Sequence, residues 1–290
     1  MALLGALVGC SGADETASVE RTTSLSEPFS TSPGEPNHEQ ITGTALAFLR
    51  PDILTALQAA NVATDVEFFL VNANHFDDCN FSGGAQVVSA SQAEAVQALN
   101  PATLGPEADL LAVRAFARSL HALQDFYAHT NWIELGGETL VDASSTAFPA
   151  LSPYTAVPST GFIIVQGSKP KRAAVTRDDG AAYPESAIVT VKLSKAAHVP
   201  GLISGTVDYE PGDFCPAAVT MSHDELNKDK SSNLDRVEQY EAAKSLAILQ
   251  TRHEWCRLVA LTGASWGEAG TARLATWVAA GQTPPDCQAE

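Results

Sequence analysis

The chain is short of basic residues, with 17 lysines and arginines against 34 acidic residues and a formal charge of −17. A protein that binds nucleic acid non-specifically needs a basic surface to displace counterions, so this balance argues against one. The sequence also has no glycine-rich phosphate loop, no nucleophile elbow and no internal repeat. Its 290 residues, 45% of them hydrophobic, are nevertheless enough for a large buried core.

Long hydrophobic runs are missing as well, because the apolar N-terminus of about ten residues is too short to cross a bilayer. Its segment Leu7–Cys10, LVGC, resembles the lipobox of bacterial lipoproteins, in which the cysteine is lipidated and becomes the first residue after cleavage of the signal peptide, so residues 1–10 are expected to be a lipoprotein-type signal segment. This predicts an exported bacterial lipoprotein, periplasmic or at the cell surface and anchored in the membrane through Cys10. The basic start of a signal peptide is absent, so a truncated gene start or a chance match stays open.

Cysteine is scarce, and four cysteines remain if Cys10 carries lipid. An even number in an exported chain predicts two disulfides, with buried free thiols as the alternative. Three pairings are possible, and we favour Cys79 with Cys215 and Cys256 with Cys287.

Among the residues that are present, a helical stripe is the strongest functional signal. His121, Asp125 and His129 recur every four residues, which places them on one helix face about 6 Å apart in rise. Imidazole and carboxylate groups are ligands for zinc, and Asp125 could bridge one ion shared with His121 to another near His129. The competing interpretation is the solvated face of an amphipathic helix, since Arg114 and Arg118 share the stripe.

The remaining chain divides by composition. Residues 11–36 are rich in Ser, Thr, Glu and Pro and are expected to form a disordered tether. Residues 37–290 are expected to form a mainly helical domain, with helices at about 38–50, 51–74, 91–99, 107–129, 233–261 and 266–280 and a loop at Gly83-Gly84. A small β-rich insertion is expected at about 139–209, with strands near 162–166, 187–193 and 202–207.

Four motifs follow one another along the chain: NHEQIT at 37–42, HFD at 75–77, HALQDFYAHTNWIELG at 121–136 and SHDELNKD at 222–229. Together they resemble the Het-C heterokaryon-incompatibility family and its bacterial relatives. That family looks like a branch of the zinc-dependent phospholipase C and single-strand zinc nuclease superfamily. The resemblance implies a helical bundle around two or three zinc ions. The implied metal ligands are His38, Asp65, His75, His121, Asp125, His129 and His223. The resemblance also implies an acidic ligand after His223, for which Glu225, Asp229, Glu241 and Glu254 are candidates.

The resemblance further implies phosphoester hydrolysis by zinc-activated water, with Asp65 as the catalytic residue that orients the water. The negative charge and the expected membrane anchor favour a phospholipid, such as a choline ester, over a polynucleotide as substrate. The alternative is a non-catalytic, metal-stabilised scaffold or interaction protein at the cell surface, in which zinc contributes folding energy without chemistry.

Overall fold

The computed structural model describes residues 38–103, 105–133, 140–141, 162–164, 197–199, 202–207, 215, 223–228 and 237–287. The expectation of a mainly helical protein is confirmed. The helices are α1 (His38–Ala45), α2 (Pro51–Glu67), α3 (Asn72–His75), α4 (Phe81–Ala98), α5 (Pro106–His129), α6 (His223–Leu226) and α7 (Val237–Ala275). The expected leader and tether at 1–36 lie outside the described residues.

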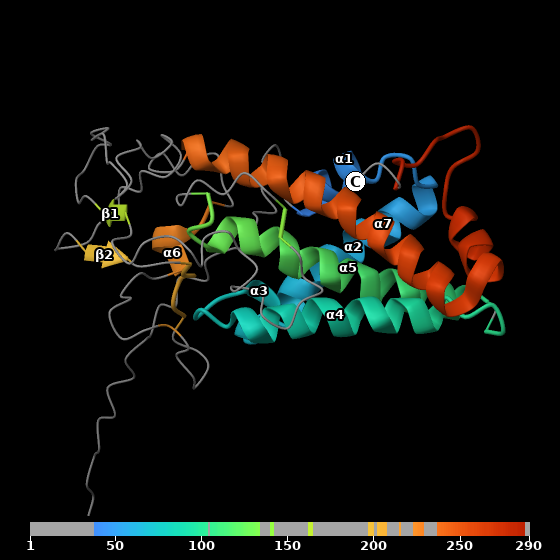
Figure 1. Ribbon diagram of the computed structural model, residues 1–290, viewed down its shortest axis with the longest axis horizontal. Helices are drawn as coiled ribbons and strands as arrows, with labels where there is room; N and C mark the ends of the chain where they lie inside the picture. Colours follow the sequence, from blue (N-terminus) through green and yellow to red (C-terminus); the bar gives the residue numbers. More distant parts are fainter. Residues whose placement is uncertain are drawn as a thin grey trace, which may run out of the picture.

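Helix α5 is the centre of the bundle, and α2, α4 and α7 all pack against it (Figure 1). Pro106 occupies the first turn, where its missing N–H costs nothing, and Glu107 and Asp109 place negative charge at the positive end of the helix dipole. From Ser119 to His129 every residue of α5 is buried. The helix therefore passes through the core, and its polar stripe is not a solvated face.

Helix α4 begins earlier than expected. The Gly83-Gly84 pair, predicted to form a loop, lies in the first turns of α4, and the Asn80 side chain caps the helix by accepting a hydrogen bond from Gly83 N–H at 3.0 Å. Gly84 is required by close packing, since a Cβ there would lie 2.3 Å from Cε1 of Phe76. The glycines thus permit an aromatic contact and do not break the helix.

Helix α7 joins the two helices expected at the C-terminal end. It bends at Gly267, whose φ of 60° and ψ of −150° are outside the helical region and suit glycine. Beyond the bend, the last turns of α7 change direction at one end of the bundle (Figure 1). The backbone N–H of Arg50 then donates to the carbonyl oxygen of Trp277 at 2.8 Å, which ties the C-terminal region to the start of α2.

The expected β-rich insertion lies largely outside the described residues. Strand β1 (Phe162–Ile164) falls within the first expected strand and pairs antiparallel with β2 (Ala197–Val199). Residues 187–193 are outside the described part of the chain. Residues 202–207, expected to form a strand, contain isolated bridges at Ser204 and Thr206, and Ser204 pairs with Thr130.

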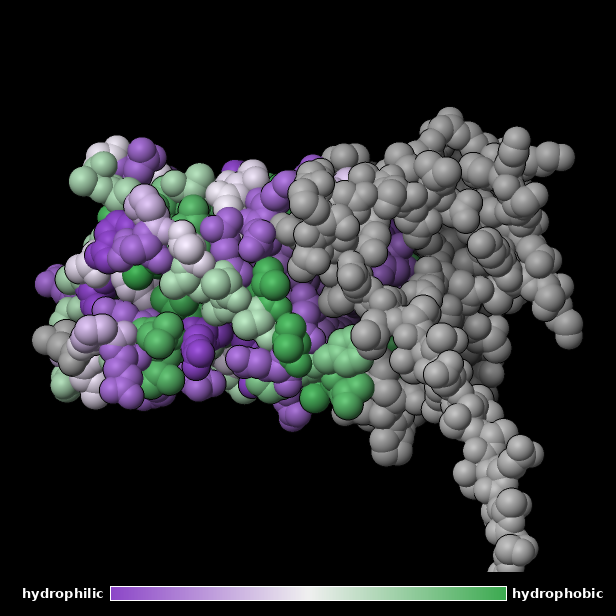
Figure 2. Space-filling view, turned by 180° about the vertical axis from the view of Figure 1, so that it is seen from behind, coloured by the Kyte–Doolittle hydropathy of each residue, from purple (hydrophilic) through white to green (hydrophobic). Residues whose placement is uncertain are grey.

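The favoured disulfides, Cys79–Cys215 and Cys256–Cys287, are both present. On the face drawn in Figure 2, hydrophilic residues are interspersed with small groups of apolar ones over the described part of the surface. Within the described residues, no helix combines the length and apolar character needed to cross a membrane.

Candidate metal centre

Two groups of histidines and aspartates meet along the buried half of α5. The inner cluster consists of His38, Asp65, His121 and Asp125, together with His75, which lies against Asp125. The outer cluster consists of Asp77, His129 and His223. The structure thus brings together all seven residues singled out in the sequence as metal ligands. It adds Asp77, which the sequence analysis did not assign to an ion.

Asp125 is the central group of the inner cluster. Its Oδ2 lies 2.8 Å from His75 Nδ1 and 3.0 Å from His121 Nε2, while its Oδ1 lies 3.2 Å from His38 Nε2. Oδ1 is also 3.9 Å from His129 Nε2, in the outer cluster. The two oxygens of this one carboxylate therefore face different groups of imidazoles, as a bridging ligand requires.

Asp65, from the last turns of α2, faces the same point. Its Oδ1 lies 3.3 Å from His121 Nε2, and its Oδ2 lies 3.8 Å from His38 Nε2. Asp65 Oδ1 and Asp125 Oδ1 are buried and accept no hydrogen bond of ordinary geometry from the described residues. A buried carboxylate oxygen without a donor is costly, so the inner cluster demands a cation.

The histidines of the inner cluster are oriented by acceptors behind them. His38 Nδ1–H donates to Gln124 Oε1 at 2.7 Å, and His121 Nδ1–H donates to Asn61 Oδ1 at 3.1 Å. His75 uses its other nitrogen, because Nε2–H donates to the carbonyl oxygen of Phe68 at 3.2 Å. In each ring the nitrogen that faces the cluster presents its lone pair to a metal once it gives up its proton, which is how metal-binding histidines are usually held.

The two amides behind these rings are themselves fixed. Gln124 Nε2 donates to the hydroxyls of Thr42 and Thr251 at 3.2 and 3.0 Å, and Asn61 Nδ2 donates to the Thr42 hydroxyl at 3.1 Å. Each amide must therefore present its oxygen to the neighbouring histidine. The sequence analysis missed both amides, because a single Asn or Gln on a helix carries no signal until its partner is known.

The outer cluster depends on a strained turn after α3. Phe76, Asp78 and Cys79 all have left-handed backbone conformations, with φ between 53° and 56°. Asp77, in the middle of this turn, places Oδ1 2.9 Å from His223 Nδ1 and 3.6 Å from His129 Nδ1. His129 Nδ1–H also lies 3.1 Å from the carbonyl oxygen of His75, which directs its Nε2 towards Asp125.

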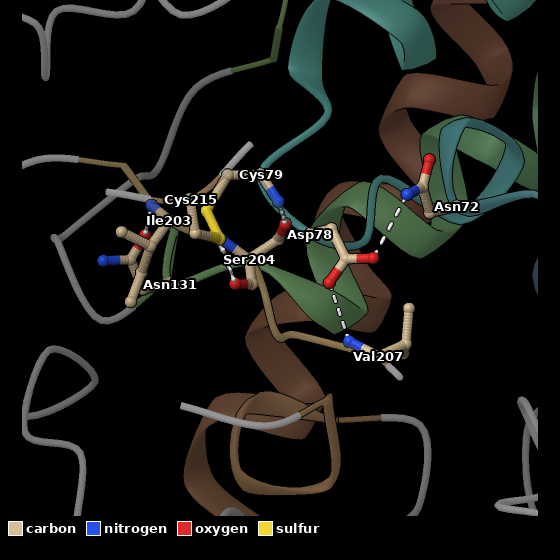
Figure 3. The surroundings of a disulfide bond; sticks show 8 residues. All are labelled: Asn72, Asp78, Cys79, Asn131, Ile203, Ser204, Val207 and Cys215. Atoms are coloured by element: carbon tan, nitrogen blue, oxygen red, sulfur yellow. Dashed lines mark hydrogen bonds between the residues drawn. A yellow bond between two sulfur atoms is a disulfide. The ribbon is translucent and has the colours of Figure 1, made fainter. Parts of the chain in front are cut away.

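A disulfide and a carboxylate hold this turn in place (Figure 3). Cys79 is bonded to Cys215, and its backbone N–H donates to the Ser204 hydroxyl at 2.7 Å. Asp78 accepts hydrogen bonds from Asn72 Nδ2 at 3.1 Å and from Val207 N–H at 2.7 Å. These contacts join α3 to the segment at 202–207, whose Thr206 carbonyl in turn accepts the backbone N–H of His223 at 3.0 Å.

Of the four candidates for an acidic ligand after His223, only Glu254 has a described side chain. The side chains of Glu225 and Glu241, and all of Asp229, lie outside the described residues. Glu254 is buried elsewhere, where Gln92 and Gln250 both donate hydrogen bonds to its carboxylate. Asp77, which precedes His223 by 146 residues, is the carboxylate that meets it.

The buried charges favour a protonated His121 beside an ionised Asp125. Burial by itself would lower the pKa of His121, but Asp125 and Asp65 reverse this effect and raise the pKa to about 10. Burial likewise opposes ionisation of Asp125, yet the neighbouring His121 and His129 hold its pKa well below the usual range. A proton on His121 Nε2 thus occupies the position from which that nitrogen would bind a metal, so metal and proton compete.

Comparison with known proteins corrects the family expected from the motifs. The model of the VWA7 N-terminal domain matches residues 44–147, which include α5 and most of the inner cluster. A human protein, von Willebrand factor A domain-containing protein 7, is 36% identical over 85 residues. These residues are 29% of this chain and 9% of the human protein, so the match spans a small part of that relative. No solved structure matches the chain significantly.

The resemblance to Het-C and the phospholipase C superfamily was therefore wrong. The expected zinc-dependent phosphoester hydrolase is wrong for the same reason, and the catalytic role of Asp65 stays an untested prediction. The reason is physical, since histidine and aspartate at helical spacing specify a set of metal donors and not one family or one reaction. The bacterial lipoprotein assignment is also corrected, because the curated relative is a human protein, and Cys10 lies outside the described residues. What the comparisons support for residues 44–147 is similarity to the VWA7 N-terminal domain.

Proposed function

We propose that the described helices form a non-catalytic, metal-stabilised scaffold that binds two divalent ions, one in each cluster, with Asp125 between them. The observation that carries this proposal is the orientation of His38, His75 and His121. Each ring donates one N–H to an acceptor behind it and turns its other nitrogen towards buried carboxylate oxygens. Such an arrangement is unfavourable without a cation and suitable with one.

Zinc fits the donor set best. Five histidines and three aspartates are available in the two clusters, and the four cysteines of the described chain are all in disulfides. Calcium and magnesium prefer sites made of oxygen ligands only, whereas mixed imidazole and carboxylate sites suit zinc and its transition-metal neighbours.

The burial of the donors supports a structural role. His38, His121 and Asp125 have no exposed surface, and Asp65, the most exposed donor of the inner cluster, is 8% exposed. Structural zinc sites are closed, while catalytic sites keep an open position for water or substrate. The ions would join α1, α2, α3, α5 and α6. An apolar cluster that includes Ile41, Phe76 and Phe126 packs at the same end of the bundle, so the ions would add to its packing and not replace it.

Metal analysis of protein purified without chelator tests this proposal. We expect about two zinc ions per chain by mass spectrometry, in line with the two clusters. Removal by EDTA should lower the melting temperature, and zinc but not calcium should restore it, because only ions that bind the folded state stabilise it. Less than one tightly bound ion per chain, or restoration by calcium alone, would contradict the proposal.

A further inference from the structure

A second site lies on the same helix face as the metal clusters but outside them. A half-open pocket of about 140 Å³ lies between α2, α4 and α5, and Glu67, Glu94 and Arg114 at its rim are exposed. Its space comes from small side chains, Ala60 and Ala63 on α2 and Ala115 on α5. Since a water molecule takes up roughly 30 Å³ in the liquid, the pocket has room for roughly five waters or one small ligand.

The pocket is lined by two charges of each sign. Arg114 and Arg118 lie one turn apart on α5, Glu67 comes from the end of α2, and Glu94 comes from α4. No nitrogen of either arginine lies within 4.0 Å of these two carboxylates or of any other in the described part of the chain. Opposite charges that line one small pocket without pairing leave both signs available to a ligand.

Arg118 is held in position for such a contact. Its guanidinium stacks over the Phe68 ring, 4.0 Å from the centroid, and its Nε–H donates to Asn74 Oδ1 at 2.9 Å. Its two terminal nitrogens make no hydrogen bond to the described residues. Burial lowers the pKa of Arg118 while Glu94 and Glu67 raise it, so both carboxylates act on this guanidinium. A fixed guanidinium loses little entropy on binding a carboxylate.

We propose that this pocket binds a small zwitterion of the free amino-acid type. The ligand carboxylate pairs with Arg114 and Arg118, and its ammonium group pairs with Glu67 and Glu94. An anion alone would meet two carboxylates and a cation alone would meet two guanidinium groups, so the pocket rejects both by like-charge repulsion. Only a ligand with both charges satisfies all four side chains.

Calorimetric titration of the metal-loaded protein with millimolar glycine, succinate and ethanolamine, at constant ionic strength and neutral pH, tests the proposal. We expect glycine to bind with one-to-one stoichiometry, and succinate and ethanolamine to bind at least tenfold more weakly. Arg114→Gln and Glu94→Gln should each weaken glycine binding roughly tenfold, the usual effect of losing one charge-assisted hydrogen bond.

The matched control is Glu268→Gln, which removes an exposed carboxylate on α7 and should leave the affinity unchanged. Zinc content measured before and after titration must also stay constant, because glycine can chelate zinc. Absence of glycine binding, equal binding of succinate, an equal loss in Glu268→Gln, or loss of zinc in step with glycine would each overturn the proposal. Whether the clusters hold metal is measured separately, by zinc analysis before titration, so failure of glycine binding and failure of the scaffold proposal can be distinguished.

Discussion

The substitution Asp125→Asn tests the bridging role of this carboxylate most directly. The change keeps the shape of the side chain but replaces one oxygen with an NH₂ group, which has no lone pair for a metal. Each Asp125 oxygen faces a different set of imidazoles, Oδ2 towards His75 and His121 and Oδ1 towards His38 and His129. Whichever way the amide turns, one set loses its ligand and the other loses the negative charge.

We expect the variant to lose metal from both clusters. Removing the charged partner of several buried imidazoles should also cost about 3–5 kcal/mol of unfolding free energy. The measurements are zinc content and urea unfolding. Asp77→Asn is the informative comparison, since Asp77 belongs to the outer cluster alone and its loss should remove one ion and leave the other.

Asp52→Asn controls for a change of charge at a carboxylate, because Asp52 is exposed and pairs only with Arg50 at the surface. Its effect on unfolding free energy should stay within about 1 kcal/mol. If Asp125→Asn leaves both zinc content and stability at the level of this control, the idea of a bridged metal centre is wrong.

Three further predictions follow from other parts of the structure. Asn61→Leu removes no metal ligand, but it leaves His121 without the acceptor of its Nδ1–H. Zinc affinity measured by competition with a chelator should therefore fall roughly 10- to 100-fold, and an unchanged affinity would refute the positioning role. Replacing Cys79 and Cys215 together by serine opens a loop of 136 residues and should lower the unfolding free energy by about 2–5 kcal/mol in oxidised protein. Burial raises the pKa of Glu254, so this group keeps its proton to a higher pH in the folded state than in the unfolded state. Its contribution to stability is complete below its pKa in the unfolded state and is lost as pH rises through its pKa in the folded state. Unfolding in EDTA at several pH values should therefore show a smaller loss of stability with rising pH in Glu254→Gln than in the unchanged protein, and parallel curves would contradict this.

Local sequence periodicity was sufficient to predict α5, the helix at the centre of the fold. The four-residue recurrence of His121, Asp125 and His129 fixed both the helix and the shared face of these residues, and the predicted start at 107 differs from the observed Pro106 by one residue. The position of Asp77 could not be predicted in this way. It depends on a turn with left-handed residues that are not glycine and on a bridge to Cys215, both of which are set by tertiary contacts.

The prediction of a loop at Gly83-Gly84 was wrong for a related reason. Glycine in a sequence usually indicates a turn, but here the missing side chain makes room for the Phe76 ring. The family assignment failed differently. The motifs predicted which residues gather at the centre of the bundle, but a set of donors suitable for zinc is shared by many unrelated proteins, so it could not identify the family or the reaction.

The burial of the clusters also has a kinetic consequence. An ion that is enclosed by ligands with almost no exposed surface can leave only after one of the surrounding helices opens locally. The cheapest parts to open are the shortest helices. These are α3 and α6, with four residues each, which carry His75 and His223, and then α1, with eight, which carries His38. Each cluster therefore has at least one ligand on a short helix that can detach. The exchange rate of an ion would report how often such a helix detaches from the bundle, and not how tightly the metal is held.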